Sequence, residues 1–324
     1  MSLRKPGSFK KHTKRRRRML KHVTKAQDFN PQLMEDIFSE ADHMETIVRH
    51  GSSNILAGKI LATLFYQPST RTRLSFETAM LRLGGQVIST ENAKEFSSAA
   101  KGESLQDTIR TVGYFANIIV LRHFESGSAE KAAMISHVPI INAGDGPGQH
   151  PTQALLDVYT IYKKFKKFEG LQVAMVGDLL NGRTVRSLCY LLSKFPIAKI
   201  WFVAPDVVRM RDDIKQHLRE HKIPFEEESD LERVAQIVDV IYQTRIQQEY
   251  FGDRSDDYQR AVGKYIINGQ LVQLMKPKAI IMHPLPRVGE ITTEVDADHR
   301  AVYFKQVENG LHVRMALLNM LLNE

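Results

Sequence analysis

Short apolar runs alternate with longer amphipathic stretches from about residue 55 to the end of the chain. Several runs are apolar without interruption, which is typical of strands covered on both faces, and helices fit between them. This alternation predicts an α/β fold with a mostly parallel sheet flanked by helices. Strands are predicted at residues 60–65, 118–121, 138–141, 173–176, 200–203, 238–242 and 279–282.

The chain has 324 residues, enough for one large or two medium domains, and its 43% hydrophobic and 25% charged residues exclude a disordered or fibrous protein. The densest turn region, 142–149, is the predicted boundary between two halves. Helices are expected after His150 and at about 311–322. Since the chain has neither an apolar run of ~18 residues nor an opening signal peptide, we expect a cytosolic protein that does not span a membrane.

The net charge of +8 is concentrated at the amino terminus, because residues 1–22 hold ten Lys and Arg and no acid. Such a tail could bind RNA or an acidic partner, or be the remnant of a transit peptide. We favour a solvated, disordered extension without nucleic-acid binding, since the tail contains no RNA-binding motif and only Phe9 as an interleaved aromatic.

Cys189 is the only cysteine and lies in the apolar run 188–192, so we predict a buried packing residue rather than a reactive thiol. No Cys/His cluster has the spacing of a zinc site. We therefore expect neither a metal nor a cofactor.

Residues 68–73, Pro-Ser-Thr-Arg-Thr-Arg, follow a predicted strand and begin a helix that ends at a Gly-Gly pair. Ser69 is the predicted N-cap. The free N–H groups of a helix start bind anions, and Arg71 could hold a phosphate through two hydrogen bonds. Because two arginines in the first turn oppose the helix dipole, this segment is predicted to bind an anion rather than to be an ordinary capped helix.

Residues 177–184, Gly-Asp-Leu-Leu-Asn-Gly-Arg-Thr, nearly match a P-loop, for which Asp239 would be the magnesium carboxylate. Arg183 replaces the P-loop lysine, however, and a planar guanidinium does not imitate that compact charge. A nucleotide hydrolase is therefore the weaker interpretation. A tight strand-to-helix turn, or a turn in which Arg183 holds a carboxylate, fits the residues better.

Other polar residues also follow predicted strands, whose carboxyl ends border the ligand crevice in open α/β sheets. They are Arg122 and His123, His150 and Gln153, Arg245 and Gln247, and His-Pro-Leu-Pro-Arg at 283–287. Together they offer cations and amides, with no carboxylate pair, nucleophile triad or metal cluster. Such a site suits a substrate with several negative charges and catalysis by positioning and electrostatics.

These motifs resemble the aspartate carbamoyltransferase family of pyrimidine synthesis, and Glu-Phe-Ser-Ser-Ala-Ala-Lys-Gly at 95–102 is most similar to its plant-type branch. The resemblance covers nearly everything after residue 25, including Leu-Arg-His at 121–123, Asn-Ala-Gly-Asp at 142–145, His-Pro-Thr-Gln-Ala-Leu-Leu-Asp at 150–157 and Thr-Arg-Ile-Gln at 244–247. Ornithine carbamoyltransferases share part of this pattern but typically have cysteine where this chain has Pro284. Arg183 and Arg245 agree with a dicarboxylate.

The resemblance implies carbamoyl transfer from carbamoyl phosphate to L-aspartate by a homotrimer of two-domain chains. After the basic tail at 1–22, residues 23–149 with 310–324 would form the carbamoyl-phosphate domain, and 150–309 the aspartate domain. Carbamoyl phosphate would be bound by Ser69, Thr70, Arg71, Thr72, Ser97, Lys101, Arg122, His150, Gln153, Pro284 and Leu285. Aspartate would be bound by Arg183, Arg245, Gln247, Lys101 and Leu285.

The catalytic residues implied by the family are Arg71, Thr72, Lys101, Arg122 and His150. Thr72, Arg122 and His150 would bind the carbonyl oxygen, while Gln153 and the backbone around 284–285 would hold the carbamoyl amide. Ser97 and Lys101 would enter from the neighbouring subunit on a mobile loop. The Leu285-Pro286 bond would be cis. The departing phosphate is the expected proton acceptor.

Gln67, Tyr250 and Gly289 stand where the family usually has Glu, Arg and Asp, and Ala100 replaces a lysine that only some members carry. In the family the first two positions help to hold the domains closed through salt links to the aspartate-binding arginines, so their loss bears on aspartate affinity. The alternatives are an ornithine-type carbamoyltransferase, a weakened homologue that binds ligand or nucleic acid, and a plastid location. The sequence carries no prediction about a regulatory chain.

Overall fold

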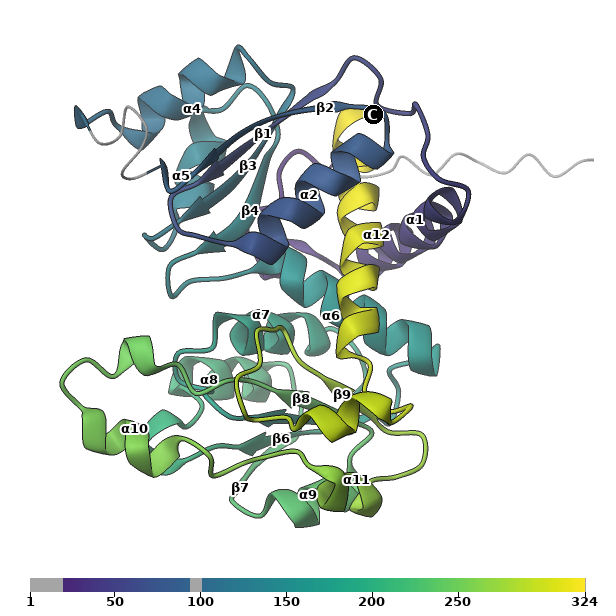
Figure 1. Ribbon diagram of the computed structural model, residues 1–324, viewed down its shortest axis with the longest axis vertical. Helices are drawn as coiled ribbons and strands as arrows, with labels where there is room; N and C mark the ends of the chain where they lie inside the picture. Colours follow the sequence, from purple (N-terminus) through teal and green to yellow (C-terminus); the bar gives the residue numbers. More distant parts are fainter. Residues whose placement is uncertain (1–19, 94–100, 324) are drawn as a thin grey trace, which may run out of the picture.

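Two parallel sheets organise the computed structural model, which describes residues 20–93 and 101–323 (Figure 1). The first sheet, of order β2-β1-β3-β4, contains β1 (Ile60–Phe65), β2 (Gln86–Glu91), β3 (Ile118–His123) and β4 (Ile140–Asp145). The second, of order β7-β6-β5-β8-β9, contains β5 (Gln172–Val176), β6 (Lys199–Val203), β7 (Phe225–Glu228), β8 (Val240–Gln243) and β9 (Ile280–Met282). Neighbouring strands are parallel throughout, which confirms the predicted fold class.

Helices cover both faces of each sheet (Figure 1). Those of the first half are α1 (Pro31–Arg49), α2 (Thr70–Arg82), α4 (Leu105–Gly113) and α5 (Ser128–Ile135). Those of the second half are α7 (Arg183–Leu192), α8 (Asp212–Glu220), α9 (Leu231–Ile237), α10 (Ser255–Ala261) and α11 (Gly269–Leu274). α6 (Pro151–Phe165) connects the two sheets, and α12 (Tyr303–Leu322) ends the chain. Among the described residues, no helix combines the length and apolarity that a bilayer crossing requires.

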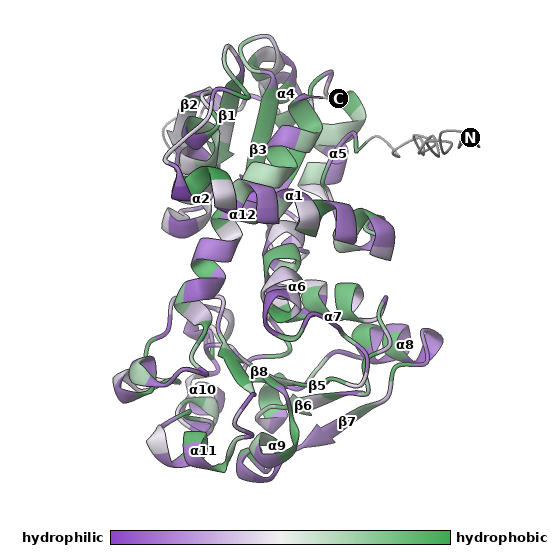
Figure 2. Ribbon diagram, turned by 90° about the vertical axis from the view of Figure 1, so that its right-hand side faces the viewer, coloured by the Kyte–Doolittle hydropathy of each residue, from purple (hydrophilic) through white to green (hydrophobic). Residues whose placement is uncertain are grey.

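The strands divide their side chains between two apolar layers. In β1, Leu61 and Phe65 pack into a core shared with α1, α2 and α12, whereas Ala62 and Leu64 belong to a separate cluster that includes α4 and α5. β5 divides in the same way between that large core and a cluster with α9 and α11. Burial on both faces explains why these strands are continuously apolar in sequence. Figure 2 shows hydrophobic residues along β3 and β8, whereas β7 is hydrophilic and the helices carry residues of both kinds.

The last helix connects the second half of the molecule back to the first. α12 packs against α1, α2 and α6 (Figure 1). It begins at Tyr303, earlier than the predicted start at residue 311. Its first turns bury Gln306 and Asn309, which donate hydrogen bonds to Asp157 and Thr160 of α6. Because these contacts are polar, the hydrophobic pattern did not reveal this part of the helix.

The predicted bounds of two strands need correction, and two further strands were missed. β4 starts at Ile140 and extends to Asp145, so residues 142–145 continue a strand and only the remainder of the predicted turn region connects to α6. β8 starts at Val240 rather than at residue 238. β2 and β7 were not predicted, because they are edge strands and their polar, partly exposed residues form no apolar run.

The predicted basic tail lies outside the described residues, except for residues 20–22. Leu20 packs against the large core, and the His22 ring accepts a hydrogen bond from the Ile140 N–H at 3.1 Å. Residues 20–22 therefore belong to the folded body rather than to the tail. Cys189 is fully buried in the same core, and burial raises the pKa of its thiol, as expected for a packing residue.

Truncation of a buried leucine should lower the free energy of unfolding more than truncation of an exposed leucine. Leu218 in α8 is fully buried, so Leu218→Ala should lower the free energy of unfolding by about 2–5 kcal/mol. Leu274 in α11 is 41% exposed, and Leu274→Ala serves as the matched control with an effect below ~1 kcal/mol. Urea unfolding of both variants measures the difference. Equal midpoints would contradict the packing of α8 on the core.

Candidate active site

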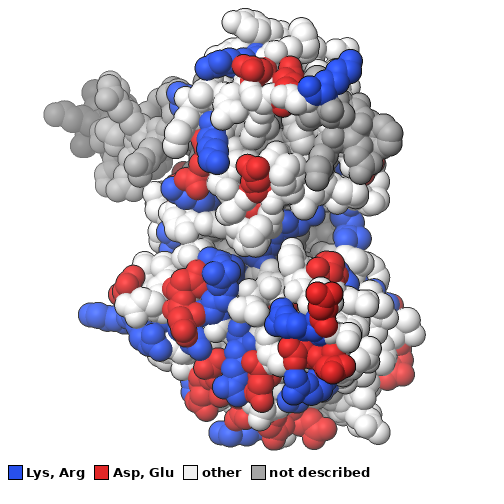
Figure 3. All heavy atoms as spheres, turned by 90° about the vertical axis from the view of Figure 1, so that its left-hand side faces the viewer, with Lys and Arg blue, Asp and Glu red and all other residues white. Residues whose placement is uncertain are grey.

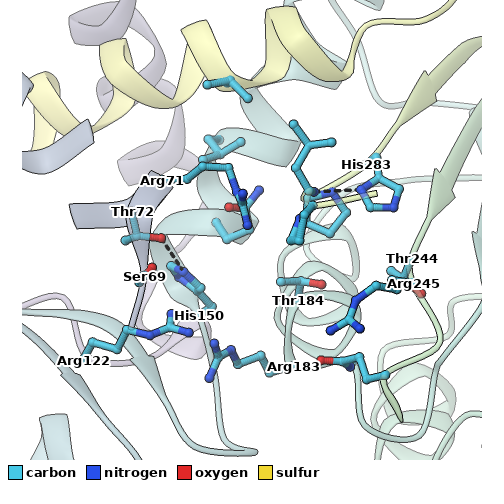
Figure 4. A pocket seen from close by; sticks show the side chains of 18 of the residues that line it. Ser69, Arg71, Thr72, Arg122, His150, Arg183, Thr184, Thr244, Arg245 and His283 are labelled. Carbon is cyan, nitrogen blue, oxygen red and sulfur yellow. Dashed lines mark hydrogen bonds between the residues drawn. The ribbon is translucent and has the colours of Figure 1, made fainter. Parts of the chain in front are cut away.

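The two halves of the chain face each other across a cavity of about 460 Å³ (Figure 4). Its walls come from segments that follow the carboxyl ends of β1, β3, β8 and β9, from the starts of α2, α6 and α7, and from α12. The crevice therefore lies where the strand ends of parallel sheets predict a ligand site. Of the strand-end candidates, His123 and Arg287 do not line it: His123 Nδ1 lies 2.8 Å from Ser128 Oγ, and Arg287 pairs with Asp296. The residues predicted to bind substrate all line it except Thr70, Ser97 and Lys101.

These three exceptions have different positions. Thr70 is the exposed first residue of α2, beside the cavity lining. Lys101 is exposed and does not line this cavity. Ser97 lies outside the described residues.

The start of α2 forms one wall of the cavity. Ser69 is the N-cap residue, as predicted, but its side chain accepts no hydrogen bond from the helix. Thr72 is buried, and its hydroxyl oxygen lies 3.5 Å from His150 Nε2. With Arg71 these residues surround a helix N-terminus that favours an anion (Figure 4).

Arg122 and Arg183 approach each other at the floor of the cavity (Figure 4). Backbone oxygens fix both: Arg122 Nη1 donates to Ala143 O at 3.1 Å, and Arg183 Nη1 donates to Gly146 O at 2.9 Å. Burial, followed by the charge of Arg183, lowers the pKa of Arg122 to about 9, and burial also lowers the pKa of Arg183. Such lowered pKa values indicate cations that gain from a bound anion.

Gly144 makes this approach of the two guanidinium groups feasible. Its φ is +112°, and a Cβ atom there would lie 3.1 Å from Arg122 Nη1 and 3.3 Å from Arg183 Cζ. A larger residue would combine backbone strain with crowding of both arginines.

Positive charge dominates the whole cavity. Among the described residues that line it, five are arginines, and Glu249 is the one carboxylate. Glu249 pairs with Arg245, while Arg314 donates to the Ser75 hydroxyl at 2.9 Å. Figure 3 shows Lys and Arg side chains gathered in the hollow between the two halves.

His150 is held as a neutral ring. It is buried at the start of α6, and its backbone N–H donates to Ser187 Oγ at 3.0 Å. Burial and the nearby charges of Arg183, Arg122 and Arg314 hold the pKa of His150 well below its usual range. A neutral imidazole can hydrogen-bond to an oxygen but cannot supply a permanent charge.

Two residues of α12 belong to the site although the sequence patterns did not predict them there. Gln306 and Arg314 both line the cavity, and both are buried. The sequence did contain one signal, because Arg314 lies within an otherwise apolar stretch of the final helix. A surface arginine of an amphipathic helix is expected on its polar face instead. Burial distinguishes Arg314 from a surface arginine: its guanidinium donates to Ser75 and lies over the Phe76 ring.

The nucleotide-hydrolase alternative is wrong for Asp239. This residue precedes β8, at the amino end of the strand, where it pairs with Lys276 at 2.9 Å and accepts the Gln172 N–H. It therefore lies at the opposite end of the sheet from the 177–184 turn. Within the described part of the chain, no group of three or more His, Cys, Asp or Glu residues could hold a metal ion.

The 283–287 segment takes the predicted backbone form. The Leu285-Pro286 peptide bond is cis, and the Leu285 N–H donates to His283 Nδ1 at 2.7 Å. His283, Pro284, Leu285 and Pro286 all line the cavity. Gly289 lies just beyond this segment, with open space where a Cβ atom would stand.

Comparison with known families assigns each half of the chain to a domain family. The carbamoyl-P binding domain of the aspartate/ornithine carbamoyltransferases matches residues 21–163, and their Asp/Orn binding domain matches residues 169–321. The chain belongs to the aspartate/ornithine carbamoyltransferase family.

Several similar relatives within this family are named aspartate carbamoyltransferases. The chloroplastic enzyme of Arabidopsis thaliana is 60% identical over 94% of this chain and 78% of its own length. The catalytic subunit of Methanopyrus kandleri is 48% identical over 93% of this chain and 96% of its own. The aspartate transcarbamoylase of Trypanosoma cruzi with carbamoyl phosphate has a TM-score of 0.89 at 39% identity and covers 93% of this chain and 96% of its own. The family resemblance found in the sequence is confirmed.

His150 should remain neutral over the pH range in which free histidine titrates. Burial and the three arginines disfavour the imidazolium, so its ring nitrogen signals in ¹⁵N-histidine NMR spectra should not shift between pH 8 and about 6.5. Because the unfolded chain binds this proton and the folded chain does not, His150 also lowers the free energy of unfolding as the pH falls below about 6.5. The His150→Gln spectrum assigns the signals. A titration midpoint at or above 6.5 would contradict this description.

Proposed function

We propose that this chain transfers the carbamoyl group from carbamoyl phosphate to L-aspartate and yields N-carbamoyl-L-aspartate and phosphate. The observation that carries the proposal is a cavity with five arginines and one carboxylate, built around the start of α2. Both substrates are multiply charged anions that such a cavity attracts. Trypanosoma cruzi aspartate transcarbamoylase, similar in fold, has been solved with carbamoyl phosphate and aspartate bound.

The phosphate would bind at the start of α2. Ser69, Thr70, Arg71 and Thr72 offer hydroxyls, backbone N–H groups and a guanidinium to its oxygens. As the bond between carbon and the bridging oxygen breaks, negative charge grows on the phosphate, and these donors stabilise it. The leaving phosphate would accept the proton that the attacking α-amine releases.

The carbonyl oxygen of the carbamoyl group would face Thr72, Arg122 and His150. Attack of the amine turns this oxygen into an oxyanion, and preorganised donors stabilise such an oxygen more than they stabilise the ground state. Arg122 supplies the charge and neutral His150 supplies a hydrogen bond. Gln153 and the backbone at 284–285 would hold the carbamoyl NH₂ group.

Aspartate would bind on the opposite wall, where Arg183, Arg245 and Gln247 meet Leu285. A guanidinium holds a carboxylate in a fixed plane, which orients the α-amine for attack. We accordingly propose that residues 23–149 with 310–324 form the carbamoyl-phosphate domain and that 150–309 form the aspartate domain.

We propose a homotrimer in which neighbouring chains share each active site. Lys101 is exposed and outside the cavity of its own chain, as a residue that serves a neighbour would be. The same domain exposes Tyr114 (83%), Phe115 (60%) and Met134 (82%) beside α4 and on α5, an apolar surface that suits a subunit contact.

We favour the plastid over the cytoplasm as the location. Five relatives with 57–60% identity are named chloroplastic enzymes. A comparison of fluorescent fusions in plant cells distinguishes the two.

Activity with aspartate but not with ornithine tests the reaction directly. A colorimetric assay should detect carbamoylated product with carbamoyl phosphate and aspartate, since two arginines suit a dicarboxylate. Arg71→Ala should lower turnover at least ~100-fold by removing a phosphate donor. Arg73→Ala is the matched control with a much smaller effect, because Arg73 pairs with Glu91 at 2.8 Å and does not line the cavity. Product with ornithine alone would overturn the proposal.

Mixed trimers test the shared site. Arg71→Ala and Lys101→Ala chains should each be nearly inactive, whereas unfolding and refolding them together should restore activity. Every interface of a cyclic trimer is heterologous, so a mixed trimer unites intact Arg71 and intact Lys101 at about one interface of three. Each variant refolded alone is the control. Hybrid trimers without activity would exclude a role of Lys101 in the neighbouring site.

A further inference from the structure

A buried carboxylate that does not line the cavity connects two of its walls. Asp157 of α6 is fully buried and accepts three hydrogen bonds. Gln153 Nε2 and Gln306 Nε2 donate to its Oδ1 at 2.9 and 2.6 Å, and the Tyr242 hydroxyl donates to its Oδ2 at 2.7 Å. These donors come from α6, α12 and β8, so Asp157 lies where the two halves of the molecule meet.

The acceptor character of this carboxylate determines how both amide side chains point. Gln153 lies one helical turn before Asp157 and must present its NH₂ end to it, which turns Oε1 away from the carboxylate. Gln306 has the same orientation for a second reason: its Oε1 accepts the His283 backbone N–H at 3.0 Å, and a backbone donor cannot be exchanged for an acceptor.

These two amides connect Asp157 to two separate segments of the cavity wall. Gln153 lines the cavity from α6, and Gln306 holds the first residue of the 283–286 segment. In the proposed function these are the two groups that accept hydrogen bonds from the carbamoyl NH₂. Gln153 lies on α6 and the 283–286 segment follows β9, and a single carboxylate sets the position of both.

We propose that Asp157 is a positioning residue that selects the carbamoyl group, by aligning Gln153 and the 283–286 segment as acceptors for its NH₂. The inference rests on the proposed function. Asp157 touches no substrate and acts through the two glutamines. Its loss leaves the phosphate and aspartate contacts in place but allows the Gln153 amide to turn its NH₂ end toward the donor NH₂ of the substrate.

Acetyl phosphate separates this role from a general loss of structure. It has a methyl group where carbamoyl phosphate has NH₂, and it keeps the same phosphate and carbonyl oxygen. An acceptor site distinguishes the two because a methyl group cannot donate a hydrogen bond. The ratio of the acetyl phosphate Ki to the carbamoyl phosphate KM, measured at saturating aspartate, reports this discrimination.

Asp157→Leu should reduce the ratio about tenfold, the size of one lost hydrogen-bond preference, with the acetyl phosphate Ki changed less than about twofold. Asp157→Asn should keep the ratio within about threefold of wild type, because its Oδ1 can still accept from both glutamines while its NH₂ faces the Tyr242 oxygen. Tyr242→Phe removes a donor from the same carboxylate but leaves both amide bonds, so it should also keep the ratio.

Three results would overturn the proposal: an unchanged ratio in Asp157→Leu, a parallel loss of both affinities, or an equal loss of discrimination in Tyr242→Phe. If Asp157→Leu does not fold, Asp157→Asn and Tyr242→Phe decide, since a ratio reduced tenfold in either contradicts the model of acceptor orientation. The wild-type enzyme tests the proposed function separately. Absence of its carbamoyl transfer to aspartate rejects the function, whereas the variants reject only the role of Asp157.

Discussion

Electrostatic repulsion among arginines is the constraint that shapes the centre of this molecule. In the parts of the chain that the structure describes, five of them line one cavity beside a single carboxylate, and burial already disfavours the charges of Arg122 and Arg183. Hydrogen bonds to backbone oxygens hold these two side chains in place but do not neutralise their charges. A bound anion would provide the countercharge. The cations of a site arranged in this way are preorganised for substrates that carry phosphate and carboxylate groups.

A cavity between two domains requires that both walls keep their separation. The large apolar core provides this, because it includes side chains from both sheets and from α1, α6, α7 and α12. Asp157, Gln306 and Tyr242 add a polar junction inside the same region. Burial raises the pKa of Asp157 to about 7, despite three hydrogen bonds that favour its charged form. The hydrogen bonds of this junction therefore offset only part of the cost of burying the carboxylate.

The sequence predicted those parts of the fold that depend on the pattern of neighbouring residues along the chain. Central strands such as β1 and β5 are apolar because both faces are buried, whereas the edge strands β2 and β7 escaped notice because their polar residues form no such run. Site residues at strand ends could be predicted together with the family resemblance, since parallel strands direct them to one crevice. Gln306 and Arg314 were not predicted, because they reach the cavity only when α12 returns across the molecule, although an arginine within an apolar helix was a signal for the second.

Gln67 and Tyr250 differ from the family pattern, but together they leave the net charge of the cavity lining as that pattern has it. Both residues line the cavity. A glutamate and an arginine are usual at these positions, so one negative and one positive charge are absent together and the net charge of the lining is unchanged. Tyr250 lines the same cavity as Arg122 and Arg183, and as a neutral phenol it adds no charge to them. The attraction of anions by the arginines of the cavity therefore does not depend on these two residues.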